Sequence, residues 1–427
     1  MESFDVVIVG GGLAGLSAAY TLARDDIGAL VVERGDYSGA KNVTGGRIYL
    51  NPVRQLLPDI WDEAPLERFI AKEKIVLMGD ESSTAIELSS NRFRQKPYHS
   101  YSILRAKFDQ WFCDKATAAG AMVITKNRVD DVVIDNGRVA GVVAGEDKIA
   151  ANCVILADGV MSLMAGKAGL RRGQPPGEYA LGIKEVVELP AKTIEERFGL
   201  AEGEGEAQAL VGSLTQGMFG GGFLYTNKES ISLGLVVGIK DLSERQPPIE
   251  APELIEDFKR RPEIARLIAG GETVEYSAHV IAEAGLAGLS RLYGDGVLVT
   301  GDAAGFTLNA GLLVRGMEFA IASGVMAARA VKMAKEKNDF SAPSLSVYQR
   351  LLEDSFVLKD LRTFRHAPHI LENPRLFKLY PQLASEILEK IMYVGDQPKA
   401  GLVATAMDAT RGKRWTLLRD LNEFRKL

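Results

Sequence analysis

The amino-terminal end of the chain alternates short apolar runs with glycine. Residues 4–9 form a β-branched apolar run, typical of a strand that is buried on both faces of a parallel sheet. A glycine-rich turn follows at residues 10–15, and residues 13–23 carry the small apolar side chains of a packed helix. Residues 29–32 are a second apolar run that ends at Glu33. The pattern predicts a strand, a tight turn, a helix and a second strand.

The turn has the Gly-x-Gly-x-x-Gly spacing of a dinucleotide-binding hinge. Gly10 permits the turn, Gly12 lets the backbone approach a pyrophosphate, and Gly15 lets the helix and the strand pack closely. Glu33 lies 18 residues after Gly15, where a carboxylate can accept the hydrogen bonds of an adenosine ribose. The order of these parts favours a nucleotide site over a structural turn.

Two later segments favour FAD over a nicotinamide as the dinucleotide. Residues 152–158 are a buried strand that runs into Gly159, and residues 297–300 are a strand directly before Gly-Asp-Ala-Ala-Gly at 301–305. An aspartate at the end of a parallel strand can hold a ribityl hydroxyl, and small residues after it admit a pyrophosphate. We expect a helix to begin near Gly311 and to direct its N-terminus toward the flavin pyrimidine edge.

The remaining periodicity predicts a second, β-rich part and a helical end. Residues 129–145 predict a hairpin around Asn136-Gly137, on a small sheet beside the dinucleotide-binding core. Leu345, Tyr348, Leu352 and Phe356 recur at helical spacing and predict a buried helix face. The predicted fold class is α/β: an FAD domain with a parallel sheet, an inserted β-rich substrate domain, and a helical C-terminal region. The bounds are 1–70, 100–165 and 285–345 for the FAD domain, 71–99 and 175–284 for the inserted domain, and 346–427 for the helical region.

Composition narrows the class of protein. The net charge of −5 over 427 residues, with no dominant basic stripe, argues against a nucleic-acid partner. Cys113 and Cys153 are the only cysteines, too few for an iron–sulfur cluster, and the four histidines have no metal-ligand spacing, so no metal site is predicted. Glu2 and Asp5 precede the uncharged stretch at residues 6–20, which disfavours a secretory signal. A cytoplasmic location is expected, with peripheral contact at the inner face of the cell membrane left open.

Several motifs resemble a known group of flavoproteins. The hinge, Ala-Asp-Gly at 157–159, the 301–305 motif and residues 103–121 resemble the para-hydroxybenzoate-hydroxylase-type FAD fold. That fold is shared by aromatic hydroxylases, geranylgeranyl reductases and electron-transfer-flavoprotein:quinone oxidoreductases. The stretches 38–49, 219–237, 278–285 and 359–383 resemble the FixC-like branch of the last class.

The resemblance implies an electron relay. Reduced electron-transfer flavoprotein, a protein of two subunits, would give electrons to FAD here, and they would leave to a membrane quinone, either ubiquinone or menaquinone. In fused relatives a ferredoxin-like domain carries a 4Fe-4S cluster. With two cysteines in this chain, the resemblance implies a separate FixX-type ferredoxin-like partner that holds the cluster, and it permits a role as the quinone branch of electron bifurcation.

The candidate site residues follow from the motifs and from the resemblance, which places Arg105 opposite the flavin linker. The candidates for FAD binding are Gly10, Gly12, Leu13, Ala14, Gly15, Glu33, Arg34, Arg47, Arg105, Val129, Ala157, Asp158, Gly159, Gly301, Asp302, Ala303, Gly305, Asn309, Ala310, Gly311, Leu312 and Leu313. The candidates beside the reacting ring and along the quinone approach are Thr44, Gly45, Gly46, Arg47, Gly221, Gly222, Phe223 and Tyr225. Tight turns and core aromatics are the structural alternative for this second set.

Other functions fit parts of the same pattern. A geranylgeranyl-reductase-like enzyme that reduces prenyl double bonds and a flavin monooxygenase would use the same fold, and a non-catalytic FAD-containing scaffold subunit would bind flavin without turnover. The tail after residue 410 is rich in arginine and lysine, with Trp415, Leu417, Leu418, Leu421 and Phe424 between them. Such a tail is typical of a solvated helix edge, of a surface that docks a partner, or of a contact with anionic lipid.

Overall fold

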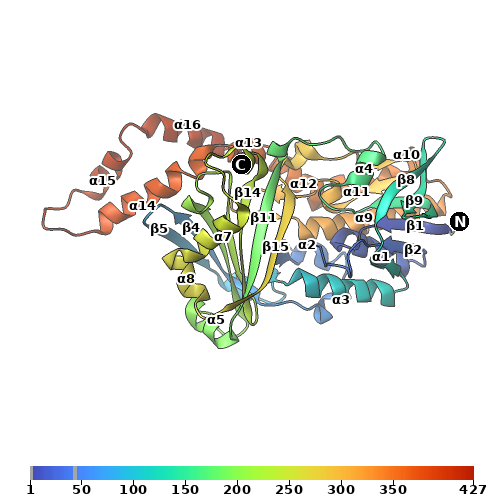
Figure 1. The fold of residues 1–427 in the computed structure, drawn as a ribbon, viewed down its shortest axis with the longest axis horizontal. Helices are drawn as coiled ribbons and strands as arrows, with labels where there is room; N and C mark the ends of the chain where they lie inside the picture. Colours follow the sequence, from blue (N-terminus) through green and yellow to red (C-terminus); the bar gives the residue numbers. More distant parts are fainter. Residues whose placement is uncertain (1–2, 42–45) are drawn as a thin grey trace.

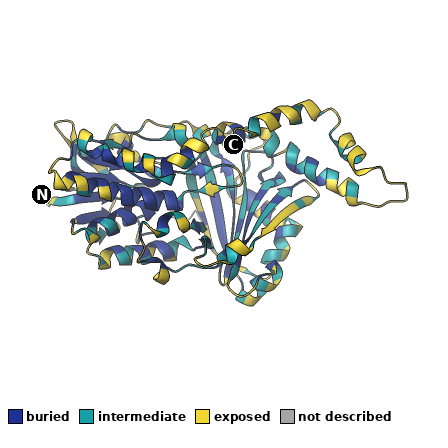
Figure 2. Cartoon of the chain, turned by 180° about the vertical axis from the view of Figure 1, so that it is seen from behind, coloured by how far each residue is buried: buried dark blue, intermediate teal, exposed yellow. Residues whose placement is uncertain are grey.

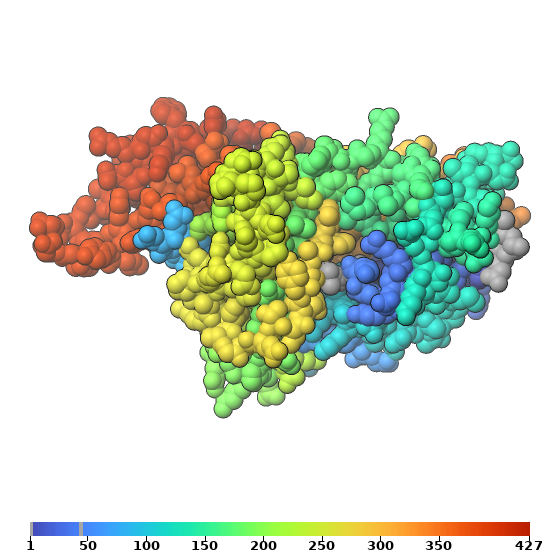
Figure 3. Space-filling view, viewed as in Figure 1, coloured from blue at the N-terminus to red at the C-terminus, as the bar shows by residue number. Residues whose placement is uncertain are grey.

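The computed structural model of the protein describes residues 3–41 and 46–427. Three parts follow one another along the long axis of the molecule (Figure 1). A sheet with its helices surrounds the amino terminus, a second sheet occupies the middle, and a helical arm built from the carboxy-terminal residues extends at the far end. The space-filling view shows the same arm projecting beyond the body (Figure 3).

The first sheet contains the predicted parallel strands. In spatial order they are β17 (Val297–Val299), β10 (Asp147–Leu156), β1 (Ser3–Val9), β2 (Ala29–Val32) and β7 (Met122–Ile124), with β16 (Tyr293–Gly294) antiparallel at one edge. Helices α1 (Leu13–Arg24), α3 (Arg105–Ala118) and α9 (Met317–Glu336) pack beside it, and α2 (Asn51–Arg54) and α4 (Leu163–Lys167) are short. The apolar runs read from the sequence are therefore buried strands, as predicted.

Helices α1 and α9 approach each other at backbone distance. A Cβ at Gly324 of α9 would lie 2.1 Å from the Ala14 carbonyl oxygen of α1, so glycine is required there. The predicted helix start near Gly311 was wrong, because α9 begins at Met317. Gly311, with φ of +81°, lies instead in a tight hairpin between β18 (Leu308–Asn309) and β19 (Val314–Arg315), which reverses the chain before the helix can start.

The predicted hairpin around Asn136-Gly137 is present, but not on a separate sheet. Strands β8 (Val129–Asp135) and β9 (Arg138–Ala144) flank the two turn residues, which both have positive φ. Strand β9 pairs antiparallel with the first residues of β10, so the hairpin extends the first sheet. Strand β10 is long enough to serve both partners, since its first half pairs with β9 and its second half with β17.

The second sheet is the β-rich part. Its order is β15 (Glu272–Ala282), β11 (Tyr179–Glu188), β14 (Ser230–Gly238), β13 (Gly220–Thr226), β12 (Glu204–Gly212), β4 (Phe69–Met78), β6 (Ser100–Ser102) and β3 (Arg47–Tyr49), with β5 (Ser83–Ser89) paired to β4. The pairs are antiparallel except β12 with β4. Strands β3 and β6 belong to this second sheet, although their residues were predicted for the FAD domain. The chain crosses between the two sheets at these ranges. The other domain bounds stay a prediction.

The two faces of the second sheet differ in chemistry. On β4 and β12, Val76, Met78 and Leu210 face a buried cluster with helices α5 (Ala191–Phe198), α7 (Ala251–Arg260) and α8 (Pro262–Ile268). Because side chains alternate along a strand, Ile75, Leu77 and Ala209 face the opposite side. Figure 2 shows the buried strands at the centre of the molecule and the exposed surface of the arm.

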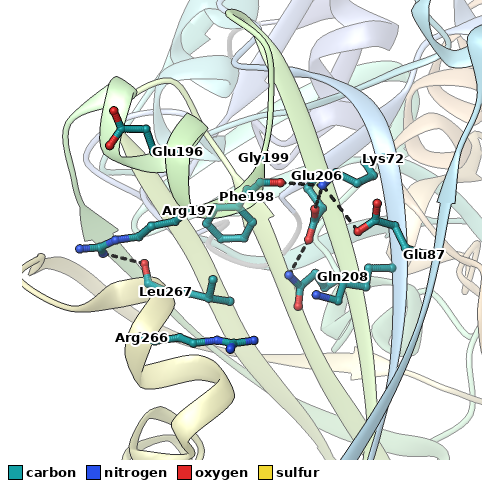
Figure 4. Close-up of a pocket in the computed structure, with 11 residues that line it drawn as sticks. Lys72, Glu87, Glu196, Arg197, Phe198, Gly199, Glu206, Gln208, Arg266 and Leu267 are labelled. Atoms are coloured by element: carbon teal, nitrogen blue, oxygen red, sulfur yellow. Dashed lines mark hydrogen bonds and ion pairs between the residues drawn. The ribbon is translucent and has the colours of Figure 1, made fainter.

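A charged pocket of about 560 Å³ lies on the helix side, between β4, β5, β12, α5 and α8 (Figure 4). Lys72 is its centre: the Nζ atom donates to the Phe198 carbonyl at 2.6 Å and pairs with Glu206 at 3.0 Å and Glu87 at 3.6 Å. The Gln208 amide also donates to Glu206 at 2.6 Å. The charge of Lys72 is therefore balanced within the chain.

The carboxy-terminal region is helical, as predicted. Its helices are α10 (Ala342–Leu345), α11 (Val347–Asp354), α12 (Phe356–Thr363), α13 (Ala367–Leu371), α14 (Leu379–Met392), α15 (Leu402–Ala409) and α16 (Arg414–Phe424), while α6 (Ile239–Glu244) belongs to the middle part. Leu345, Tyr348 and Leu352 are buried, and Phe356 is partly buried. No helix in the described ranges is both long and apolar enough to span a membrane.

One carboxylate fastens the last helix to the arm. Asp420 of α16 accepts hydrogen bonds from Arg375 Nε at 2.6 Å, Arg375 Nη2 at 2.8 Å, Asn373 at 2.9 Å and the Tyr380 hydroxyl. These bonds, with that of Arg375 first, hold the pKa of Asp420 far below its usual range. Removing the charge would leave four donors without their acceptor, so Asp420 fixes where α16 lies.

The Lys72 network generates a stability prediction. Replacing Lys72 with Met leaves the Glu206 carboxylate, only 3% exposed, without its cation at 3.0 Å, which should lower the free energy of unfolding by about 3 to 5 kcal/mol. Denaturant unfolding measures the loss. The control is Lys192→Met on α5, whose side chain is 87% exposed and pairs with Glu196 at 3.9 Å; it should change stability by less than about 1 kcal/mol. Equal effects of the two substitutions would contradict the prediction.

Candidate functional site

Four loops meet at the carboxyl edge of the first sheet. Gly10 follows β1, Glu33 follows β2, Asp158 lies just after β10, and Asp302 lies just after β17. Because these strands are parallel neighbours, their carboxyl ends lie side by side. Four segments that are far apart in the sequence therefore border one crevice, in the place where open α/β sheets bind nucleotides.

The hinge is built by contacts that only glycine permits. Gly10 has φ of +103°, and a Cβ there would lie 2.4 Å from the Ala157 carbonyl oxygen. A Cβ at Gly15 would lie 2.0 Å from the Gly10 carbonyl oxygen, so helix α1 starts directly against the turn. Gly12 is the N-cap of α1, and no side chain in the described part of the chain caps the helix. The N–H groups of the first turn, around Leu13 and Ala14, are left for an anion such as a pyrophosphate.

The second strand supplies the polar groups for a ribose. Glu33 is buried, and its Oε2 and Oε1 atoms accept hydrogen bonds from the amides of Gly11 at 2.7 Å and Gly35 at 2.5 Å. Ser38 Oγ is buried beside them and has no hydrogen-bond partner among the described residues. A buried hydroxyl without a partner is costly unless a ligand completes it. The residues present therefore fit the adenosine half of FAD.

The other two loops carry one aspartate each. Asp158 accepts from the Met164 amide at 3.0 Å and the Ser162 hydroxyl at 3.3 Å, so it orders its own turn. Burial raises the pKa of Asp302, and the nearby His279 and Arg105 partly oppose that increase. Arg105 donates to Asp109 at 2.9 and 2.8 Å. Asp302 is therefore one of three carboxyl groups at this crevice, with Glu33 and Asp158, and its role in holding a ribityl hydroxyl stays a prediction.

Arg171 joins the loops after β10 and β17. Its Nη1 atom donates to the Val160 carbonyl at 2.7 Å and to the Ala303 carbonyl at 3.3 Å. Gly301 lies in the loop after β17, and a Cβ there would lie 2.7 Å from the Ala14 Cβ. This loop therefore packs directly on the hinge helix α1. Sequence reasoning did not select Arg171, because its partners are backbone atoms that only the fold brings together.

The remaining candidates for FAD binding differ in their position and in their exposure to solvent. Ala157 and Gly159 flank Asp158, Ala303 and Gly305 follow Asp302, and Gly159 and Gly305 have positive φ. Arg34 is exposed after Glu33, whereas Val129 is buried at the start of β8. The roles of these residues in binding FAD stay a prediction.

A mainly apolar cavity of about 740 Å³ opens on the other side of the second sheet from the charged pocket. It is bordered by β4, β12 and β13, by the β18–β19 hairpin, and by the carboxy-terminal helices through Tyr380, Phe424 and Leu427. The predicted quinone-side residues Gly221, Gly222, Phe223 and Tyr225 line it, and so do the predicted flavin-side residues Asn309, Ala310, Gly311, Leu312 and Leu313. Both predicted sets therefore meet in one cavity.

Arg47 lies in the wall of this cavity with its charge balanced. The guanidinium donates to both carboxylate oxygens of Glu73, one of them at 2.9 Å, and to Ser100 Oγ at 3.0 Å. It also lies over the Tyr49 ring, 4.4 Å from the centroid. Gly46 packs on Tyr225, since a Cβ would lie 2.7 Å from that ring. Thr44 and Gly45, the other candidates in this loop, lie outside the described residues.

Several polar residues of the cavity wall were missed by sequence reasoning. Burial, followed by Arg47, lowers the pKa of His99 to about 4, so the imidazole is neutral near pH 7. Burial raises the pKa of Tyr225, which therefore keeps its proton. Burial also raises the pKa of Glu283 to about 7, and the hydrogen bond from Asn309 opposes this shift. Glu73, His99 and Glu283 carry no motif of their own; the stretch 278–285, already singled out, was the one available signal for Glu283.

Comparisons with known proteins agree with this geometry. Three family models match the chain: FAD dependent oxidoreductase over residues 5–173; ETF-QO, ubiquinone-binding over 179–281; and ETF-QO/FixC family C-terminal domain over 367–426. The chain is 43% identical to the probable electron transfer flavoprotein-quinone oxidoreductase YdiS of Escherichia coli K12, covering 96% of this chain and 98% of YdiS. It is 46% identical to FixC of the same strain, covering 93% and 92%.

Solved structures share the fold at lower identity. A geranylgeranyl bacteriochlorophyll reductase-like protein from Thermoplasma acidophilum aligns with a TM-score of 0.74 at 20% identity, over 99% of this chain and 100% of that one. PqsL of Pseudomonas aeruginosa, a probable FAD-dependent monooxygenase, aligns with a TM-score of 0.63 at 17% identity, over 88% and 98%. At these identities the likeness concerns the fold.

The fold and the site define an FAD-dependent oxidoreductase. More specifically, the chain belongs to the ETF-QO/FixC family, with an FAD-binding part and a ubiquinone-binding domain. The predicted fold class and the predicted family are thereby confirmed. The match to the ubiquinone-binding domain covers β11 to β15, the sheet whose strands wall the apolar cavity.

The hinge generates a binding prediction. Gly15→Ala places a Cβ 2.0 Å from the Gly10 carbonyl oxygen and must move α1 away from the turn. An overpacking cost of about 1 to 3 kcal/mol corresponds to roughly ten- to hundredfold weaker FAD binding. The flavin-to-protein absorbance ratio after dialysis and a fluorescence titration of the apoprotein with FAD measure it. Gly28→Ala is the matched control, because its Cβ would meet only Asp5 Oδ2 at 3.7 Å. Full flavin content in both variants would refute the assignment of the hinge.

Proposed function

We propose that this protein accepts electrons from a reduced two-subunit electron-transfer flavoprotein and passes them to a membrane quinone. The supporting observation is that the Asn309–Leu313 segment, which follows the Asp302 loop of the FAD crevice, also lines the apolar cavity beside Gly221, Gly222 and Phe223. Bound FAD supplies the redox chemistry, and the chain supplies its position and the site for the acceptor. The similarity to YdiS and FixC supports the donor.

The cavity suits the ring and first tail units of a quinone. Small side chains on β12 and glycines on β13 leave space, and Phe219, Phe223 and Phe377 supply apolar walls. Apolar pockets with a few placed polar groups are typical of small-molecule sites. The polar groups here include the Arg47–Glu73 pair, His99 and the Glu283–Asn309 pair. Arg47, with its charge balanced by Glu73, orients an acceptor oxygen rather than neutralising a full negative charge.

We further propose that helix α16 of the arm rests on a lipid surface. Trp415, Leu418 and Leu421 of α16 are 86%, 58% and 60% exposed, and Phe424 and Leu427 of the same segment line the cavity. Exposed apolar residues between arginines and lysines are the pattern of an interfacial helix. A quinone that leaves the lipid would then enter the cavity past α16. The same proposal includes a location in the cytoplasm, peripheral to the inner face of the membrane.

A FixX-type ferredoxin-like partner that carries a 4Fe-4S cluster belongs to the same proposal. The two cysteines of this chain cannot hold such a cluster, and the similarity to FixC is what supports a separate carrier. A place in the quinone branch of a bifurcating complex with electron-transfer flavoprotein is compatible with this arrangement. Prenyl reductases and flavin monooxygenases share the fold, and the reductant that bleaches the flavin separates those two functions from the relay.

The first experiment follows the visible flavin band of the purified, anaerobic protein. Reduced electron-transfer flavoprotein should bleach it and a short-chain ubiquinone analogue should restore it, whereas NADPH should leave it unchanged. Bleaching by NADPH alone would refute the relay and favour a reductase or a monooxygenase. A flavin that no reductant bleaches would support a scaffold subunit.

A cavity variant locates the acceptor site. Ala209 lines the cavity on β12, so Ala209→Phe should lower the rate of reoxidation by the quinone at least about tenfold by filling the space. Reoxidation by ferricenium, a small one-electron acceptor, should be unchanged. Ala201→Phe, at an exposed turn, is the control and should behave as the wild type. Unaltered quinone kinetics in Ala209→Phe would place the acceptor elsewhere.

A vesicle experiment tests the lipid contact. Replacing Leu418 and Leu421 with Ser removes two exposed apolar side chains, each worth about 1.5 to 3 kcal/mol when buried. Sedimentation with phosphatidylglycerol–phosphatidylcholine vesicles should fall more than about tenfold. The control, Val274→Ser with Tyr276→Ser, removes equally exposed apolar groups from β15 and should sediment as the wild type. Equal losses in both double variants would argue against α16 as the contact.

A further inference from the structure

Glu283 is a carboxyl group in the wall of the apolar cavity. It directly follows β15, and its backbone N–H donates to the Glu178 carbonyl at 2.9 Å. Its side chain accepts a hydrogen bond from Asn309 Nδ2 at 3.0 Å. Among the described residues no lysine or arginine forms an ion pair with it. An acid in an apolar wall without a cation costs free energy, and such groups occur at sites of proton chemistry.

Asn309 is oriented by a second hydrogen bond. The Gly311 amide donates to Asn309 Oδ1 at 2.9 Å, so the oxygen is already occupied and the amide nitrogen faces Glu283. The nitrogen donates to Oε2 of Glu283, which leaves Oε1 to carry a proton. This orientation holds for both protonation states of the acid, so the carboxyl can lose and regain a proton without rearranging its neighbour.

The other polar groups of the cavity are less suited to giving up a proton near pH 7. Arg47 and Glu73 are committed to each other, and His99 is neutral because its pKa is lowered to about 4. Burial raises the pKa of Tyr225 and, with its bond to Asp420, that of Tyr380 to about 12, so both phenols keep their protons.

We propose that Glu283 delivers one of the two protons that a quinone takes up in this cavity. The inference rests on the proposed function. In the step, the Glu283 O–H bond breaks and a quinone oxygen gains that proton. Bound FAD, in its reduced anionic form, would supply the two electrons and the second proton and would be oxidised, and the quinone would become the quinol. The Glu283 carboxylate then regains a proton from water, so atoms and charge balance.

The pKa shift agrees with this role. Burial raises the pKa of Glu283 to about 7, and the Asn309 hydrogen bond lowers it again in part. Near neutral pH the acid is therefore partly protonated, which suits a group that must both give and take a proton. The charged or titratable residues that line the cavity with Glu283 are Arg47, Tyr49, Glu73, Lys74, His99, Tyr225 and Tyr380. Its own strand also carries Glu272, Glu275, Tyr276 and His279, and the neighbouring elements carry Glu178, Tyr179, Arg315, Glu318, Asp360 and His366.

Two acceptors separate proton transfer from electron transfer. The dithionite-reduced, FAD-loaded protein is mixed with a short-chain ubiquinone analogue or with ferricenium, which takes an electron and no proton. Glu283→Gln should slow quinone reduction about a hundredfold and leave the ferricenium rate unchanged. The wild-type quinone rate should fall as pH rises through about 7, where the acid loses its proton, and the Glu283→Gln rate should lose that limb. Glu283→Asp should recover part of the rate.

Two further variants sharpen the test. Asn309→Leu removes the bond that favours the carboxylate, so the alkaline limb should move to higher pH. Glu272→Gln, an exposed position at the other end of β15, is the matched control and should match the wild type. Infrared difference spectra of the apoprotein supply a readout without turnover: a carboxylic C=O band should titrate near pH 7 and be absent in Glu283→Gln.

The outcomes are distinct. Wild-type quinone kinetics in Glu283→Gln, with an unchanged pH profile, would overturn the proton role and leave the proposed function standing. Loss of the ferricenium reaction as well would show that Glu283 supports the flavin and would also overturn the role. A wild-type protein that reduces ferricenium but no quinone would overturn the proposed function, and this inference with it.

Discussion

The parallel pairing of β17, β10, β1 and β2 is the constraint on which the rest of the site depends. Each pair is fixed by buried apolar side chains, and their register aligns the four carboxyl ends. Once they are aligned, the Gly10 turn, Glu33, Asp158 and Asp302 border the same crevice. The contact between Gly15 and the Gly10 carbonyl, at which a Cβ would be only 2.0 Å away, then fixes α1 against that edge.

The second sheet carries the charged pocket on one face and the apolar cavity on the other. Alternation along β4 and β12 directs Lys72 and Glu206 to the helix side and Ile75 and Ala209 to the cavity side. The charged network therefore stays on the face away from the cavity and does not make it polar. The carboxy-terminal helices, fastened through Asp420, close the cavity where Tyr380 and Phe424 meet the sheet.

The polar groups of the cavity divide into two kinds. Arg47 and Glu73 neutralise each other and stiffen the wall, whereas Glu283 has an amide and, among the residues that the structure describes, no cation as its partner. In a low-dielectric environment this difference decides whether an acid stays ionised or titrates near neutrality. The chemistry of the site therefore depends on which carboxyl has a cation beside it.

The sequence by itself determined the parts that rest on local rules. Glycine spacing, buried β-branched runs and the Asn-Gly turn predicted the hinge, the parallel strands and the hairpin, because steric limits act over a few residues. Only the tertiary structure decided that α9 begins at Met317, that β3 and β6 join the second sheet, and that Glu73, His99 and Glu283 share a cavity with Gly221 and Asn309. These outcomes depend on burial and on contacts between distant segments, and no single stretch of sequence contains them.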